Sequence, residues 1–264
     1  MATLLATTSK SVLRVDTESD SIDVIETGHG VYYGMATRHD LLYVAARNRG
    51  LTDSMEHTEQ IRVIDNRGNL YGSLRNPLFL DLHSIAWVED ELWVAATALD
   101  TIVTIDSHGN AFTVLPYTDA GNDRHHINTL AVAWPFVAVV AHNHSDPSEI
   151  SYVHIASRRT ALTRVKLGMQ AHNFWVRDGE TLVCSSSDGA IVGNRGLHVP
   201  IDGVPRGVAV HGEQTFIGVS PVCDRASRDE GSPRIDVFGP AFQLERSIEL
   251  PAEGQVMDLM MWSS

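Results

Sequence analysis

One pair of strands recurs six times along the chain, and this repeat constrains the fold more than any other feature of the sequence. In each copy an apolar strand carries a distinctive residue near its start, and a β-branched, Ala-rich strand follows after a short turn. Five copies are complete: YYGMATRHDLLYVAAR (32–47), LHSIAWVEDELWVAAT (82–97), INTLAVAWPFVAVVAH (127–142), AHNFWVRDGETLVCSS (171–186) and PRGVAVHGEQTFIGVS (205–220). A sixth copy starts with VMDLMMW (256–262), and TLLATTSKSVLRVD (3–16) supplies its second strand from the other end of the chain.

The spacing of the copies predicts the number and size of the repeating units. The 264 residues divided among six copies give 44 residues each, which is the length of a four-stranded propeller blade. A third strand follows in four copies, and turn sequences such as DNRG and DSHG then precede a fourth. We therefore predict an all-β protein, a six-bladed β-propeller that residues 1–264 form as a single domain. Its last blade is closed by the N- and C-terminal strands.

The first strand of each blade lines the channel of a propeller, so equivalent residues on these strands are expected to form a ring. That ring contains Tyr33, His83, Asn128, His172, Arg206 and Met257, with Asp258 as the alternative in the last blade. His126 lies two residues before Asn128, and side chains two apart on a strand point the same way. We expect His126 and Asn128 to face the channel at different depths.

Polar side chains of this kind indicate a site in the channel rather than a packed core. Neutral imidazoles from different blades are suitable ligands for a divalent metal, so His83, His126 and His172 are the candidate metal ligands. Zn or Fe is the expected metal, with Ca or Mn as alternatives. The competing interpretation is a hydrated channel without chemistry, because a chain with 13 histidines aligns some of them by chance.

Other polar residues of the ring and its rim are candidates for catalysis and substrate binding. Tyr33 can donate or accept a proton, and Arg206 can hold a carboxylate through two parallel hydrogen bonds. The candidate substrate-binding residues are Asn128, Asn173, Asp258, His142 and His144. The two histidines follow the second strand of their blade, so their loop is expected to open on the same face as the ring.

The charge of the chain narrows the classes of partner. The sequence has 33 Asp and Glu against 20 Lys and Arg, a net charge of −13, which argues against nucleic acid and anionic membranes as partners. The longest apolar run, 130–141, contains a proline and is too short to span a bilayer. Without a recognisable secretory signal and with only two cysteines, a cytoplasmic protein with a small-molecule substrate is expected.

Several further segments have ordinary structural interpretations. DAGND (119–123) is too short for a calcium loop and lacks its terminal Glu, so an inter-blade turn is expected. The polar segment 223–233 is long enough to cover the channel. Cys184 is expected in the core. Four tryptophans on inner strands are expected to pack between blades: Trp87, Trp93, Trp134 and Trp175.

Several segments resemble the DUF4915-like bacterial propeller proteins. They are LHSIAWVEDELWVAAT, DRHHINTLAV, AHNFWVRDGETLVCSSSDGAI, RGVAVHGEQTFIGVS, RIDVFG and GQVMDLMMW, within residues 80–262. The function of that family is poorly defined, so this resemblance implies a fold rather than a reaction.

A looser similarity of architecture links the chain to metal-dependent propeller enzymes. A peptidyl-hydroxyglycine lyase of the NHL type holds zinc on three histidines, with a tyrosine and an arginine near the substrate. That similarity implies the same roles for His83, His126, His172, Tyr33 and Arg206. The SMP-30-like lactonases place Glu, Asn and Asp around a divalent cation, and the absence of Glu from the ring disfavours this second comparison.

The sequence therefore leads to two hypotheses of different class. The first is a metal-dependent enzyme that performs a lyase, hydrolase or isomerase step on a small polar, carboxylate-bearing substrate in the channel. The second is a non-catalytic propeller module that binds a protein or a glycan through the loops of its top face. A ligand sensor that uses the same pocket without turnover is a third reading.

Overall fold

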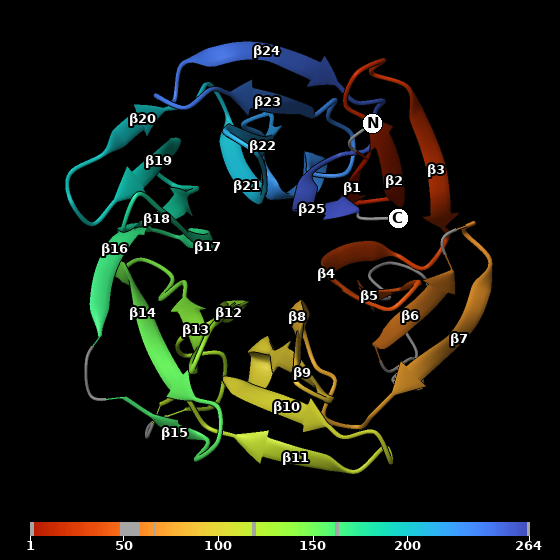
Figure 1. Ribbon diagram of the computed structural model, residues 1–264, viewed down its shortest axis with the longest axis vertical. Coiled ribbons are helices and arrows are strands. Elements are labelled where there is room, and N and C mark those ends of the chain that lie inside the picture. Colours follow the sequence, from red (N-terminus) through yellow and green to blue (C-terminus); the bar gives the residue numbers. More distant parts are fainter. Residues whose placement is uncertain (1–2, 48–58, 66, 118–119, 162–163, 263–264) are drawn as a thin grey trace.

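The computed structural model describes residues 3–47, 59–65, 67–117, 120–161 and 164–262. These residues form six β-sheets arranged as blades around a common axis, with the two ends of the chain meeting in one blade (Figure 1). The six-bladed propeller predicted from the repeat is confirmed, and so is the closure of its last blade by terminal strands.

Each blade is a meander of antiparallel strands that runs from the axis outward. Blade 1 contains β25 (Val256–Trp262), β1 (Thr3–Thr8), β2 (Ser11–Asp16) and β3 (Ile22–Thr27). Blade 2 contains β4 (Val31–Arg38), β5 (Leu41–Arg47), β6 (Gln60–Asp65) and β7 (Leu70–Arg75). Blade 3 contains β8 (Leu82–Val88), β9 (Glu91–Ala96), β10 (Thr101–Ile105) and β11 (Ala111–Val114).

The remaining blades follow the same plan. Blade 4 contains β12 (Ile127–Ala133), β13 (Phe136–Ala141) and β14 (Pro147–His154), and both β15 (Arg159–Thr160) and β16 (Val165–Met169) pair with β14. Blade 5 contains β17 (Ala171–Arg177), β18 (Glu180–Ser185), β19 (Ala190–Gly193) and β20 (His198–Pro200). Blade 6 contains β21 (Val204–His211), β22 (Gln214–Ser220), β23 (Arg234–Phe238) and β24 (Leu244–Glu249). Two short 3₁₀ segments, η1 (Thr97–Leu99) and η2 (Arg225–Ser227), complete the described elements.

The second strand of each blade is apolar on both faces because neighbouring blades cover both of them. In β13, the five residues from Val137 to Ala141 are fully buried. Such strands are continuous apolar runs rather than alternating ones, which is typical of strands buried on both faces. Cys184 is buried in β18, as expected. Trp93 and Trp175 are also buried, but the prediction for Trp134 was wrong, because this residue lies at the β12–β13 turn and is 68% exposed.

The first strand of every blade has an irregular register close to the position that defines the predicted ring. The pairing of β4 with β5 shifts between Tyr32 and Met35, and that of β8 with β9 shifts between Leu82 and Ile85. The corresponding strands of the other blades, β12, β17, β21 and β25, shift at equivalent places. A bulge redirects side chains locally, so the same irregularity repeated six times gathers one set of side chains around the axis.

A second ring of residues, one position after the first, ties neighbouring blades together. It contains Gly34, Ser84, Thr129, Asn173, Gly207 and Asp258. Ser84 Oγ, Thr129 Oγ1, Asn173 Oδ1 and Asp258 Oδ2 each accept a hydrogen bond from a backbone N–H of the following blade, at 2.6–3.2 Å. At the two glycines the following blade is too close for a side chain, since a Cβ on Gly34 would lie 2.6 Å from Ser84 Cα. This second ring is therefore a structural belt.

The described residues contain no helix that is long and apolar enough to cross a membrane.

Candidate functional site

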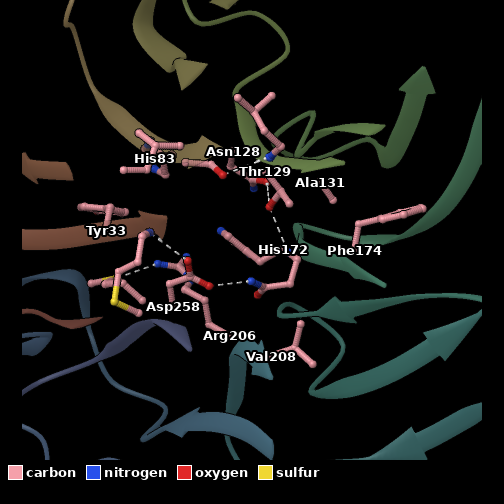
Figure 2. A pocket seen from close by; sticks show the side chains of 16 residues that line it. Tyr33, His83, Asn128, Thr129, Ala131, His172, Phe174, Arg206, Val208 and Asp258 are labelled. Atoms are coloured by element: carbon pink, nitrogen blue, oxygen red, sulfur yellow. Dashed lines mark hydrogen bonds between the residues drawn. The ribbon is translucent and has the colours of Figure 1, made fainter. Parts of the chain in front are cut away.

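Two cavities lie along the axis, one on each side of the first ring. The upper cavity has a volume of about 500 Å³ and is polar, and the lower cavity has a volume of about 160 Å³. Tyr33, His83 and Arg206 line both and so form the boundary between them. Figure 2 shows the lower cavity with these three residues around it. A cavity of several hundred cubic ångströms is large enough for a small-molecule ligand.

The upper cavity is lined by charged and imidazole side chains from four blades and from the loops at their upper ends. Its lining residues are Tyr33, Arg47, Asp81, His83, Asp123, His126, His142, His144, Ser145, Gln170, Arg206 and Arg228. Four histidines and three arginines around one polar cavity make it the candidate functional site.

Five aromatic rings follow one another around the channel, from blade 2 to blade 5. Ring centroids lie 4.6 Å apart for Tyr33 and His83, 4.9 Å for His83 and His126, and 4.8 Å for His126 and His142. His172 continues the row at 5.5 Å from His142. The four imidazoles are thus close enough to act on one ligand.

Hydrogen bonds fix the tautomers of three of these histidines. The Nδ1 of His83 donates to the carbonyl of Asp81 at 3.0 Å, and the Nδ1 of His126 donates to the carboxylate of Asp123 at 2.7 Å. The Nδ1 of His172 lies 2.9 Å from the carbonyl of Gln170, which can only accept. The proton on each Nδ1 leaves Nε2 with a free lone pair, which is the arrangement of metal-binding histidines with an outer oxygen partner.

Burial keeps these imidazoles neutral. It lowers the pKa of His83 and His172 well below the usual range, and the neighbouring arginines Arg47 and Arg206 add to the effect. Burial also lowers the pKa of His142 to about 3, with further contributions from His126 and Arg206. For His126, burial lowers the pKa although Asp123 opposes it. Neutral imidazole is the form that binds a metal.

Two groups of side chains have the spacing of potential metal ligands among the residues that the structure describes. Asp81, His83 and His126 form one group, and Asp123, His126 and His144 form the other. Within each group the potential ligand atoms lie within 4.8 Å of one another. His126 is common to both, so the histidine side of the upper cavity is where a cation would be held.

Asp100 anchors the loop that carries Asp123 and His126. It is fully buried at the end of η1, and its carboxylate accepts hydrogen bonds from the backbone N–H groups of Gly121, Arg124, His125 and His126 at 2.7–3.2 Å. A carboxylate that accepts several amide hydrogen bonds holds a loop in one conformation. Asp100 therefore positions the two residues of this loop that line the cavity.

A second network orients Asp81. Arg47 forms ion pairs with Asp81 and, at 3.2 Å, with Glu59. Its guanidinium also lies over the ring of Tyr33, 4.8 Å from the centroid. Glu59 in turn accepts a hydrogen bond from the backbone N–H of Leu82 at 2.5 Å. The positions of Asp81 and Tyr33 are thus linked through one arginine.

A left-handed residue precedes the first strand of the three blades that supply most of the site. Asp81, His126 and Gln170 have φ of 58°, 50° and 50°. They occupy equivalent positions, two residues before His83, Asn128 and His172, and all three line the upper cavity. The prediction that His126 and Asn128 reach different depths agrees with their lining of different cavities, but His126 lies outside the strand, so the pleat is not the reason.

The structure divides the predicted site residues between the two cavities. His83, His126, His142, His144, Tyr33 and Arg206 line the upper one. Asn128, His172, Asn173 and Asp258 line the lower one. His172 therefore does not belong to either group of potential ligands, and Asp81 lies beside His83 and His126 in its place.

The polar atoms of the lower-cavity residues are largely engaged within the protein. Asn128 Nδ2 donates to the carbonyl of Ala171 at 2.9 Å, and Asn173 Nδ2 donates to Asp258 at 3.2 Å. Asp258 also accepts from the backbone N–H groups of Met35 and Leu259. Burial raises the pKa of Asp258 to about 7. These contacts hold the blades together, which is a role that the sequence analysis did not assign to them.

Sequence reasoning missed three charged residues of the upper cavity. Asp123 belongs to DAGND, the segment interpreted as a plain turn, and that interpretation was incomplete because Asp123 contacts His126. Asp81 precedes His83 by two residues, so a D-x-H pattern was available as a signal. Arg228 comes from segment 223–233, which was expected only to cover the channel.

Comparisons with solved structures agree with the fold. A chain from the crystal structure of a nidogen/laminin complex is similar with a TM-score of 0.71 and 11% identity, over 99% of this chain and 98% of that one. A protein of unknown function from Bacteroides caccae gives a TM-score of 0.70 and 11% identity, over 100% and 99%. A streptogramin B lyase gives a TM-score of 0.55 and 11% identity, over 83% of this chain and 69% of that one.

These likenesses are too distant in sequence to show more than a propeller-type fold. No family model and no curated protein matches the sequence, so the resemblance to DUF4915-like proteins stays unconfirmed. One of these neighbours carries the name of a lyase.

Proposed function

We propose that the protein is a metal-dependent enzyme that acts on a small carboxylate-bearing molecule in the upper cavity. The observation that carries the proposal is the group formed by Asp81, His83 and His126, whose potential ligand atoms lie within 4.8 Å of one another. The reaction class remains the one expected from the sequence, a lyase, hydrolase or isomerase step.

The donor set fits a transition metal better than an alkaline-earth ion. Two neutral imidazoles and one carboxylate are the ligands found in open Zn²⁺ sites and in non-haem Fe²⁺ sites. Ca²⁺ prefers six to eight oxygen ligands, and the histidines do not supply them. Zn or Fe is therefore the proposed metal, and Asp81, His83 and His126 would hold it.

The remaining residues of the cavity have separate roles in this proposal. Arg206 binds the carboxylate of the substrate, since its guanidinium lines the cavity and has no carboxylate partner among the described residues. Tyr33 donates or accepts a proton at the boundary between the cavities. A bound metal would polarise a substrate oxygen or make a bound water more acidic. Arg47 keeps Asp81 and Tyr33 in place.

The metal content of purified protein tests the proposal. Tag-free protein reconstituted with zinc, iron or manganese and freed of excess metal is measured by elemental mass spectrometry, beside His83→Ala and the control His108→Ala. His108 is exposed at the β10–β11 turn, so its loss leaves the site intact. We expect one metal per chain in the wild type and the control, and at least tenfold weaker binding in His83→Ala, on the order found for lost metal-site contacts.

His172→Ala distinguishes the two ligand sets. With Asp81 as third ligand this variant keeps its metal, whereas with His172 as third ligand the metal is lost. Absence of metal from the wild type after reconstitution with all three ions would refute the proposal. That result would favour the non-catalytic alternative, in which the upper loops bind a protein or a glycan.

A further inference from the structure

Within the part of the chain that the structure describes, two half-buried arginines of the upper cavity lack the acidic partners that a guanidinium group in such a place normally has. Arg206 from β21 and Arg228 from segment 223–233 both line the cavity, and the Nε of each is buried without a hydrogen-bond partner among the described residues. Neither forms an ion pair within the described residues, whereas Arg47, the third arginine of the cavity, pairs with Asp81 and Glu59.

Among the described side chains, the Arg206 guanidinium forms a hydrogen bond only with the sulfur of Met257, which lies 3.2 Å from Nη1. A thioether is a weak acceptor and carries no charge, so it does not compensate the buried cation. Burial lowers the pKa of Arg206, and the positive charges of Arg228 and Arg47 act in the same direction. Both arginines line the same cavity, so neither relieves the positive charge of the other.

The acidic residues of the cavity do not neutralise this pair. Asp81 is bound by Arg47, and Asp123 accepts from His126. A buried charge without a partner is costly, and proteins hold one mainly where a ligand supplies the counter-charge. Arg206 and the half-buried Arg228, each with an enclosed Nε, therefore place two positive charges beside one cavity for a ligand to neutralise.

We infer that the ligand of the upper cavity is a small dianion whose charges are bound by Arg206 and Arg228. The two charges can come from a dicarboxylate, with one carboxylate on each arginine, or from a single phosphate group shared by both. The inference deepens the proposed function by naming the charge of its substrate, and it does not require that a metal is bound.

Isothermal titration of metal-free protein tests the inference. Protein treated with EDTA and desalted is titrated at pH 8 and low salt with malonate, succinate, glutarate and inorganic phosphate. The monomethyl esters of the three dicarboxylates are the matched monoanions. The same series is repeated with Arg206→Gln, Arg228→Gln and the control Arg159→Gln, which removes an exposed arginine of β15. Urea unfolding verifies that the variants are folded.

We expect at least one dianion to bind the wild type and the control at least tenfold more tightly than its monoanion, as an added charge-assisted hydrogen bond should provide. Arg228→Gln should lose this preference, and Arg206→Gln should weaken both classes of ligand roughly tenfold or more. Preference for a dicarboxylate or for phosphate identifies the source of the two charges.

Equal affinity for dianions and monoanions would overturn the inference, and so would unchanged dianion binding in Arg228→Gln or no binding to the wild type. Failure of the proposed metal site is recognised separately by elemental analysis, since these titrations contain no metal.

Discussion

Asp100→Asn is the substitution that most directly tests how the fold supports the site. The carboxylate of Asp100 accepts from four backbone N–H groups in loop 121–126. An asparagine keeps one oxygen that accepts hydrogen bonds. Its NH₂ group replaces the second oxygen and faces backbone N–H groups, which cannot accept a hydrogen bond. Two part-buried amides then lack an acceptor, at up to about 1–3 kcal/mol each. Allowing for partial relaxation, we expect the free energy of unfolding to fall by about 2–4 kcal/mol.

Urea unfolding followed by tryptophan fluorescence measures this loss, and elemental analysis measures the effect on the site. Because the loop carries Asp123 and His126, metal affinity should fall together with stability, by roughly tenfold or more. Asp106→Asn is the matched control. Asp106 accepts from the N–H groups of His108 and Asn110, but these bonds are exposed, so water replaces them and the loss should stay below about 1 kcal/mol.

If both variants unfold at the same urea concentration and Asp100→Asn keeps the metal affinity of the wild type, the Asp100 carboxylate neither stabilises nor positions loop 121–126. Loss of stability with unchanged metal binding would show that the loop does not orient His126, and would leave Asp100 with a purely structural role.

Two further predictions concern the structural belt. Gly34→Ala should lower the free energy of unfolding by about 1–3 kcal/mol, because its Cβ would lie 2.6 Å from the backbone of Ser84. Gly72→Ala is the control, and it should cause no such loss because no atom lies within 4 Å of a Cβ at this position. Equal urea midpoints for the two variants would contradict this prediction. The folded-state pKa of Asp258, about 7, exceeds its usual value of 3.8, so its contribution to stability is greatest below pH 3.8 and is lost as the pH rises to about 7. Between pH 4 and pH 8 the wild type should therefore lose up to about 4 kcal/mol of unfolding free energy relative to Asp258→Asn. A difference between the two proteins that does not change with pH would show that the Asp258 pKa is ordinary.

The sequence was sufficient to predict the fold because every blade packs against its neighbours in the same way and uses similar residues to do so. The second strand must be apolar on both faces, and the first strand must bulge at the axis, so both features recur at a fixed spacing. That spacing located Tyr33, His83 and Arg206 at the axis without any compact motif. It also assigned Asn173 and Asp258 to substrate binding, because pattern alone cannot tell a polar residue that faces a ligand from one that faces the next blade.

The residues that were missed lie just before the repeated strands, where side-chain direction depends on backbone conformation rather than on the pleat. In blades 1, 2 and 6 a glycine with positive φ stands three residues before the ring position, at Gly254, Gly30 and Gly203. In blades 3, 4 and 5 a left-handed residue with a side chain stands two residues before it: Asp81, His126 and Gln170.

A left-handed backbone conformation destabilises a residue that has a side chain by roughly 1–2 kcal/mol, and glycine has no such penalty. Three adjacent blades have such a residue, and the polar side chain of each lines the upper cavity: Asp81, His126 and Gln170. Local strain of this kind is concentrated at functional sites. The same three blades provide His83, Asp123, His142 and His144, so the strained residues and the candidate metal ligands occupy one half of the ring. Arg206 and Arg228, which have no ion-pair partner among the described residues, both come from blade 6, in the other half. In the proposed function, the half of the upper cavity with Asp81, His83 and His126 would hold the metal, and the half with Arg206 and Arg228 would bind the anionic substrate.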